Sequence, residues 1–226
     1  MNLKYLGHSC FLIRTKGRTL VVDPYLSGNP KADQTDPESI QADYVLITHG
    51  HHDHVGDAVQ IAKHNSARVI SNFEIVAWFA SHGIKGYGMN IGGSRSFDFG
   101  TIKVVNATHS STLPDNTPGG NPGGFVIWNE EACLYIAGDT GLHMDMRLIP
   151  MICPKLSAAI LPLGDNYTMG YRDAVIAAAF IQCDRIIGCH FDTFDLIKLD
   201  HFKALAAFKA EDRELILPDI GSEINL

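Results

Sequence analysis

The chain has 226 residues, of which 46% are hydrophobic and 19% are charged, and this composition predicts a globular protein with a well-buried core. Its 25 acidic residues outnumber the 18 basic ones and no run of Lys and Arg stands out, so the formal charge of −7 argues against a nucleic-acid backbone as the main partner. The N-terminus is too polar for a secretory signal, and no stretch approaches the roughly 20 apolar residues that a membrane helix needs.

The cysteines indicate a reducing compartment. The chain has 5 of them, an odd number, and they are scattered without any C-x-x-C pair: Cys10, Cys133, Cys153, Cys183 and Cys189. We therefore expect reduced, mostly buried thiols in a cytoplasmic protein.

Short apolar and β-branched runs recur along the whole chain, and several of them are continuously hydrophobic. Such runs are typical of strands that are covered on both faces. The expected strands lie at residues 11–15, 19–23, 44–48, 67–71, 101–105, 124–128, 133–137, 158–161, 185–189 and 214–217.

Helix-like segments lie between these strands, at residues 55–65, 73–83, 171–183 and 199–211. Gly83 is a plausible stop for the second of them. Strands mixed with helices favour an α/β layered architecture, in which helices pack outside the sheets. No linker divides the chain, so we expect a single domain over residues 1–226. The loosest stretch, residues 110–124, contains three Pro and four Gly and predicts a long surface loop.

Potential metal ligands stand just past the C-terminal ends of several predicted strands, where the loops of layered α/β proteins present their chemistry. They are His49, His51, Asp53 and His54 after strand 44–48, His109 after 101–105, Asp139 after 133–137 and His190 after 185–189.

The spacing within "THGHHDHVGD" (48–57) indicates which of its side chains can bind the same ion. His49 and His51 are two positions apart, so in an extended or turn backbone they can point the same way and share one ion. Asp53 and His54 then enter the following turn, where Asp53 is also a candidate helix N-cap. His52 does not fit this pattern, so we expect it to be a spacer that binds nothing.

The whole set offers five imidazoles and two carboxylates. That number is too large for one tetrahedral site, but it suits two ions, each with three protein ligands and an open position for water. Taken alone, His109 or His190 would more often be a buried structural histidine, and Asp139 a turn or cap residue. Taken together, the seven residues indicate a metal centre far more strongly than any one of them.

These motifs resemble a known family. "THGHHDH" matches the H-x-H-x-D-H motif of the metallo-β-lactamase fold superfamily, and the later His, Asp and His follow in the expected order. The stretches "YLGHSCFLI", "DPYLSGNP", "AGDTGL", "LPLGDNYTMG" and "CHFDTF" are similar to successive signatures of one prokaryotic group of metal-dependent hydrolases, related to L-ascorbate-6-phosphate lactonase. The resemblance covers nearly the whole chain and departs from the group at His52, where Gly is usual.

The resemblance implies a fold of class α+β, a four-layer αβ/βα sandwich of two stacked sheets with helices outside. Two pseudo-symmetric halves, about 1–110 and 111–226, would join near the 110–124 loop. It also implies how the seven ligands divide between two ions. One ion would be held by His49, His51 and His109, and the other by Asp53, His54 and His190, with Asp139 bridging both.

The implied activity is that of a metal-dependent hydrolase. Two divalent ions can share a water and lower its pKa, and the resulting hydroxide attacks a carbonyl carbon or a phosphorus. The expected substrate is a small ester, lactone, thioester or phosphoester. Zn is the first choice of metal, with Mn or Fe as alternatives, because imidazole suits Zn and carboxylates suit the other two. Ser110 and Ser111 are expected to form hydrogen bonds near the site and not to act as nucleophiles.

Several residues outside the ligand set are weaker candidates. We assign catalytic roles to Asp53 and to His8, which lies at a predicted hairpin turn and would donate a proton or contact substrate, with a structural role as the alternative. Asp23 would orient a ligand histidine or serve as a turn carboxylate. Asn166 and Thr168 would bind substrate or else cap the helix that follows them.

Other functions remain open at this stage. A nuclease or phosphodiesterase would need a basic face or an RNA-binding arm, which this sequence does not show. Redox chemistry at a di-iron site is known from flavodiiron proteins, which resemble the expected fold but carry a carboxylate at the position of His51 and need a flavin module. A metal-binding sensor without catalysis is compatible with the ligand set. We expect a small-molecule substrate, no nucleic acid and no membrane, and we allow for a homo-oligomer such as a dimer.

Overall fold

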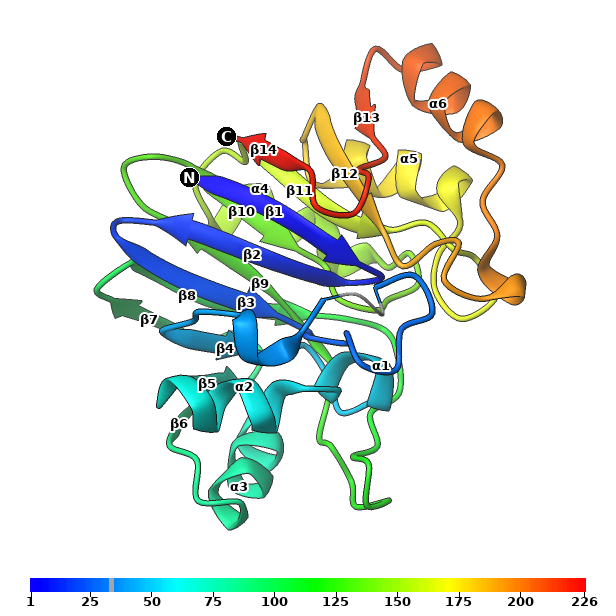
Figure 1. Ribbon diagram of the computed structural model, residues 1–226. Coiled ribbons are helices and arrows are strands. Elements are labelled where there is room, and N and C mark those ends of the chain that lie inside the picture. The colour runs from blue at the N-terminus through cyan, green and yellow to red at the C-terminus, as the bar shows by residue number, and fades with distance from the viewer. Residues whose placement is uncertain (33–34) are drawn as a thin grey trace.

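The computed structural model describes residues 1–32 and 35–226, which form two stacked β-sheets with helices on their outer faces (Figure 1). The first sheet has seven strands in the order β14-β1-β2-β3-β4-β5-β6. The pairs from β14 to β3 are antiparallel, and those from β3 to β6 are parallel. Its strands are β1 (Asn2–Gly7), β2 (Cys10–Thr15), β3 (Arg18–Val22), β4 (Tyr44–Leu46), β5 (Arg68–Ser71), β6 (Gly86–Gly88) and β14 (Glu223–Asn225).

The second sheet repeats this pattern, with seven strands in the order β7-β8-β9-β10-β11-β12-β13. The pairs from β7 to β10 are antiparallel and those from β10 to β13 are parallel. Its strands are β7 (Ser94–Phe97), β8 (Gly100–Asn106), β9 (Gly123–Trp128), β10 (Cys133–Ile136), β11 (Ala158–Pro162), β12 (Arg185–Cys189) and β13 (Glu214–Ile216).

Helices cover the outer face of each sheet. Figure 1 shows α2 and α3 on one side of the paired sheets, and α5 and α6 on the other. The helices are α1 (His52–Val55), α2 (Ala58–Asn65), α3 (Phe73–Ser81), α4 (Ile149–Ile152), α5 (Tyr171–Phe180) and α6 (His201–Ala210), with short 3₁₀ turns η1 (Pro37–Ser39), η2 (Met144–Leu148) and η3 (Asp195–Ile197).

Three hydrophobic cores separate the four layers. Phe11 of the first sheet and Phe125 of the second belong to the core between the sheets. Val45 packs with Phe79 of α3 in the core under the first helical layer, and Phe208 of α6 belongs to the core under the second. Successive side chains of a strand point to opposite faces, so a continuously hydrophobic strand fills two of these cores at once. The predicted four-layer sandwich is confirmed.

The ten predicted strands are all present, and four further strands were missed: β1, β6, β7 and β14. The sequences of β6 (GYG) and β7 (SRSF) carry little apolar signal because both lie at open sheet edges. The chain passes from the first sheet to the second between Gly88 and Ser94, ahead of the boundary near 110 that we expected. The division into two pseudo-symmetric halves within one domain stays a prediction.

The predicted helix 55–65 is wrong in its start, because the helix is broken in two at Gly56. This glycine has φ 29° and ψ −113°, and a Cβ there would lie 2.5 Å from the carbonyl oxygen of Pro24. The next amide, that of Asp57, donates to the same carbonyl at 2.7 Å. The close approach of the segment after β3 therefore turns the chain, and α1 becomes a separate single turn that carries Asp53 and His54.

Asp57 fixes the loop after β3 to the start of α2. The residue is 9% exposed, and its carboxylate accepts hydrogen bonds from the amides of Leu26 (2.7 Å) and Ser27 (3.0 Å), and from the Ser27 hydroxyl (2.6 Å). Buried amides without an acceptor are costly, so this carboxylate holds the segment that supports α1.

No helix in the described part of the chain combines the length and the apolar character that crossing a membrane requires.

We predict that Asp57→Ala lowers the free energy of unfolding by about 1–3 kcal/mol, because the buried Leu26 amide and the partly buried Ser27 amide lose their acceptor. Urea unfolding followed by circular dichroism measures this change. Asp184→Ala is the matched control, since Asp184 is exposed, and should stay within about 0.5 kcal/mol of wild type. Equal stability of the two variants would show that Asp57 does not anchor this loop.

Candidate metal centre

The seven predicted ligands lie at one edge of the paired sheets, because the strands that carry them end there. His49 follows β4, Asp139 follows β10 and His190 follows β12, all three of which belong to the parallel parts of the sheets. The carboxyl ends of parallel strands meet at the same edge of a sheet. Stacking of the two sheets then brings the two edges together.

His49, His51 and His109 form the first group, in which one ligand atom of each lies within 4.8 Å of the others. His49 Nε2 is 3.0 Å from His51 Nδ1. The outer nitrogens of both rings have hydroxyl partners, Thr48 Oγ1 at 3.0 Å from His49 Nδ1 and Ser110 Oγ at 3.3 Å from His51 Nε2. These contacts orient the inner nitrogens towards one another.

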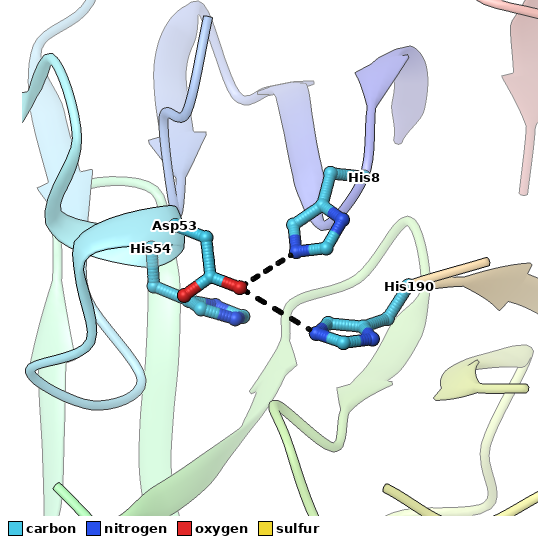
Figure 2. A group of neighbouring side chains, drawn as sticks. All are labelled: His8, Asp53, His54 and His190. Carbon is cyan, nitrogen blue, oxygen red and sulfur yellow. Dashed lines mark hydrogen bonds and ion pairs between the residues drawn. The ribbon is translucent and has the colours of Figure 1, made fainter. Parts of the chain in front are cut away.

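Asp53, His54 and His190 form the second group, which also includes His8 within the same 4.8 Å limit. Figure 2 shows one carboxylate oxygen of Asp53 facing two imidazoles. That oxygen, Oδ2, is 3.1 Å from His8 Nε2 and 3.8 Å from His190 Nε2.

Asp139 lies between the two groups. Its Oδ2 atom is 2.9 Å from His190 Nε2, 3.3 Å from His54 Nε2 and 3.7 Å from His109 Nε2. His49, His54 and Asp139 also meet the 4.8 Å criterion as a group of their own. One carboxylate therefore contacts residues of both predicted ion sites.

The buried polar atoms of the cluster fit a bound metal. Among the described residues, His54 Nε2, Asp139 Oδ1 and both ring nitrogens of His190 are buried without a hydrogen-bond partner. His190 Nε2 and Asp139 Oδ2 are close, but they are not aligned as donor and acceptor. Buried polar groups are rarely left in this state, whereas ligand atoms that converge on a shared cation are close without bonding to one another.

The protonation of the cluster supports the same interpretation. Burial alone would lower the pKa of His190, but the carboxylates of Asp139 and, to a lesser extent, Asp53 outweigh it and raise this pKa to about 9. Burial would likewise lower the pKa of His54, yet Asp139 and Asp23 hold it well above its usual value. The buried carboxylate thus favours the protonated, positively charged form of its neighbouring imidazoles. When these imidazoles are neutral metal ligands, a divalent cation supplies the positive charge instead.

Three residues around the cluster have the left-handed backbone that non-glycine residues seldom adopt. They are His8 (φ 55°), Asp23 (φ 43°) and His190 (φ 52°), and they directly follow β1, β3 and β12. Such conformations cost about 1–3 kcal/mol each and persist where surrounding contacts impose them. At this edge their side chains reach the cluster, where His8 contacts Asp53, Asp23 contacts His54 and His190 contacts Asp139.

Asp23 contacts His54, a predicted ligand, directly. Its Oδ2 atom is 2.8 Å from His54 Nδ1 and accepts from the Thr48 hydroxyl at 2.7 Å, while Oδ1 accepts from the Thr48 amide at 2.9 Å. With Nδ1 held by Asp23, Nε2 of His54 faces Asp139. This is the arrangement by which carboxylates orient metal-binding histidines, and the orienting role of Asp23 remains our prediction.

The structure corrects the predicted N-cap. The N-cap of α1 is His51, and Asp53 is the second residue of the helix. Its carboxylate faces His8 and His190 instead of a backbone amide. His52 is exposed and belongs to none of the ligand groups found in the described residues, and its role as a spacer stays a prediction.

The outer candidates lie in different surroundings. His8 exposes none of its side chain, so a substrate would have to displace a neighbour to reach it. Asn166 is exposed, and the buried Thr168 hydroxyl donates to the Met169 carbonyl, in a loop whose Met169 amide bonds to the Thr140 carbonyl. Within the described residues neither side chain forms a hydrogen bond to a predicted ligand. The catalytic and substrate-binding roles of these residues stay predictions.

Two hydroxyl groups of the site escaped the sequence analysis, those of Thr48 and Thr193. Thr48 contacts both Asp23 and His49, and Thr193 Oγ1 lies 2.9 Å from His8 Nδ1. Thr48 directly precedes the His-rich motif, so its position could have been noticed. Nothing local marks Thr193, which is 185 positions from its partner.

We predict that Asp23→Ala weakens metal binding roughly 10- to 100-fold, because His54 loses the carboxylate that orients it. Titration of metal against a competing chelator measures the affinity. Asp43→Ala is the control, since Asp43 also holds a backbone amide, that of Thr19 at 2.9 Å, but joins no ligand group. An affinity equal to that of wild type in Asp23→Ala would contradict the orienting role.

Comparison with known proteins identifies the family. A family model described as a beta-lactamase superfamily domain matches residues 2–190. A UPF0173 metal-dependent hydrolase of Flavobacterium johnsoniae is 48% identical over 226 residues, and the match covers 100% of both chains.

Solved structures agree with this match. Igni18, a metallo hydrolase of the hyperthermophilic archaeon Ignicoccus hospitalis, has a TM-score of 0.89 and 31% identity, and the match covers 100% of this chain and 97% of that one. The metallo-beta-lactamase fold protein YhfI of Bacillus subtilis has a TM-score of 0.75 at 15% identity, covering 99% and 98%, which shows the fold alone. The chain therefore belongs to the β-lactamase superfamily, and it is a metal-dependent hydrolase of the UPF0173 group.

Proposed function

We propose that this hydrolase cleaves a small ester, lactone, thioester or phosphoester at a centre for two divalent ions. His49, His51 and His109 would hold one ion, Asp53, His54 and His190 would hold the other, and Asp139 would belong to both sets. The observation that carries the proposal is the position of Asp139, whose Oδ2 atom lies within 3.7 Å of ligand nitrogens from each set.

A pair of such ions lowers the pKa of a water molecule towards neutrality and withdraws negative charge from the attacked centre. The chain supplies what this chemistry requires around it. Four of the proposed ligands are at most 3% exposed, so they hold their positions without competing water: His49, His54, Asp139 and His190. Asp23, Thr48 and Ser110 fix the ring orientations of the histidines they contact.

The open side of the cluster gives the direction from which substrate arrives. The side chains of Asp53 and His109 are 30% and 14% exposed, whereas those of His54 and His190 are at most 2% exposed. Phe194, 37% exposed, lies beside this opening with its ring centroid 5.6 Å from that of His8. We therefore place the scissile bond next to Asp53, with room for an apolar substituent against Phe194.

The remaining attributes of the proposal have separate support. Zn is the preferred ion because five of the seven ligands are imidazoles, and Mn and Fe are the alternatives. All five cysteines are free, four of them buried, which supports a cytoplasmic location. A homo-oligomer remains part of the proposal on general grounds only.

We expect a chelator to abolish hydrolysis and Zn or Mn to restore it. The assay screens wild-type protein, stripped and then reconstituted with each metal, against lactone, ester, thioester and phosphoester substrates. Activity that survives removal of all metal, as verified by elemental analysis, would rule out the proposed chemistry.

We also predict that the double variant Asp53→Ala/His54→Ala loses turnover by a factor on the order of 10³ or more, since the second ion would lose two of its ligands. The control is His52→Ala, which removes an exposed imidazole next to Asp53 in the sequence and should keep wild-type turnover. The two-ion centre would be refuted by a double variant as active as this control.

A further inference from the structure

His8 has a partner at each ring nitrogen although it is not among the seven predicted ligands. Nε2 lies 3.1 Å from Asp53 Oδ2, and Nδ1 lies 2.9 Å from Thr193 Oγ1. His8 is 1% exposed and Thr193 is 5% exposed, so their mutual contact is shielded from water, whereas the Asp53 side chain is 30% exposed. Hydrogen bonds thus run from the buried Thr193 through the buried imidazole to the partly exposed carboxylate of Asp53.

We propose that Thr193 and His8 are positioning residues: Thr193 fixes the tautomer of His8, and His8 in turn holds the carboxylate of Asp53 for metal binding. The proposal rests on the metal-binding role proposed above for Asp53. It differs from the roles in proton donation and substrate contact that the sequence suggested for His8, because it has His8 act through Asp53.

The donor and acceptor of each of these two hydrogen bonds follow from the chemistry of Asp53 and Thr193. An ionised carboxylate only accepts hydrogen bonds, so His8 Nε2 must be protonated and donate the hydrogen bond to Asp53. A neutral imidazole then offers Nδ1 as an acceptor, and the Thr193 hydroxyl is the group that donates to it. The alternative acceptor for this hydroxyl, the Phe191 carbonyl, lies farther away at 3.4 Å.

The backbone of His8 is held as firmly as its ring. It occupies the turn between β1 and β2 with φ 55°, and its carbonyl accepts from the His190 amide at 2.8 Å and from the Tyr5 hydroxyl at 3.2 Å. One residue therefore contacts the backbone of His190 and the side chain of Asp53, two members of the same proposed ligand set. Figure 2 shows His8 and His190 on the same side of the Asp53 carboxylate.

The competing interpretation is that His8 is itself a ligand, since it meets the distance criterion with Asp53, His54 and His190. The two interpretations require opposite tautomers. A ligand must present an unprotonated Nε2 and carry its proton on Nδ1, with Thr193 as the acceptor. A positioning residue carries the proton on Nε2.

Nitrogen-15 NMR of the imidazole side chains distinguishes the tautomers in the intact protein, both stripped of metal and loaded with Zn. The His8 signals are assigned by their loss in His8→Gln. We expect the Nε2–H tautomer in both samples. The Nδ1–H tautomer in the Zn-loaded protein would overturn the proposal and make His8 a ligand.

Zn titration of variants against a chelator gives the second readout. Thr193→Val should weaken one of two bound equivalents roughly 10-fold, and Thr193→Ser should restore it, because outer contacts of this kind typically contribute 10- to 100-fold in affinity. Thr15→Val removes another buried threonine hydroxyl, bonded to Glu131, and should bind as wild type does. Unchanged Zn binding in Thr193→Val would refute the role of Thr193.

Substitution of His8 separates a hydrogen-bond donor from a ligand. His8→Ala should weaken the same equivalent, whereas His8→Gln, with an amide donor in place of the ring N–H, should largely retain it. Failure of His8→Gln to exceed His8→Ala would count against the positioning role. If Asp53→Ala retained both Zn equivalents, the proposed ligand set would fail, while the NMR measurement on metal-free protein would still decide the bond from His8 to Asp53.

Discussion

The buried carboxylate of Asp139 is the constraint on which this edge of the molecule depends. It is 3% exposed and surrounded by imidazoles, and an ionised carboxylate away from water is costly unless positive charge lies beside it. His190 and His54 supply that charge in the absence of metal, and their pKa values rise accordingly. The same demand makes the place suitable for divalent cations, which is why we put the shared position of the proposed centre here.

The two sheets bring these residues to Asp139 because both sheets have the same arrangement of strands. Each sheet has an antiparallel part followed by a parallel part, and the strands before Asp23, His49, Asp139 and His190 are parallel strands that end at the same edge. The two edges meet because the sheets share one core. Side chains that are distant in sequence thereby reach hydrogen-bonding distance without a long loop to carry them. The left-handed backbone at Asp23 and His190 completes the turn into the cluster.

Much of the fold and the set of residues at the site could be predicted from sequence, for physical reasons that also explain the omissions. Strands covered on both faces are continuously apolar, so β4 and β12 are recognisable, whereas the edge strands β6 and β7 are polar or glycine-rich and are not. The metal-binding motif is dense and local. The break at Gly56 depends on the approach of Pro24, and the hydrogen bond between Thr193 and His8 joins residues 185 positions apart. Neither contact leaves a pattern in the local sequence.

The most direct test of the central claim is a crystal structure of the purified protein with the metals located by anomalous scattering and counted by elemental analysis. The account predicts two ions per chain, one near His49, His51 and His109, the other near Asp53, His54 and His190, with Asp139 contacting both and His52 contacting neither. A single ion, or an ion bound by His52, would contradict it.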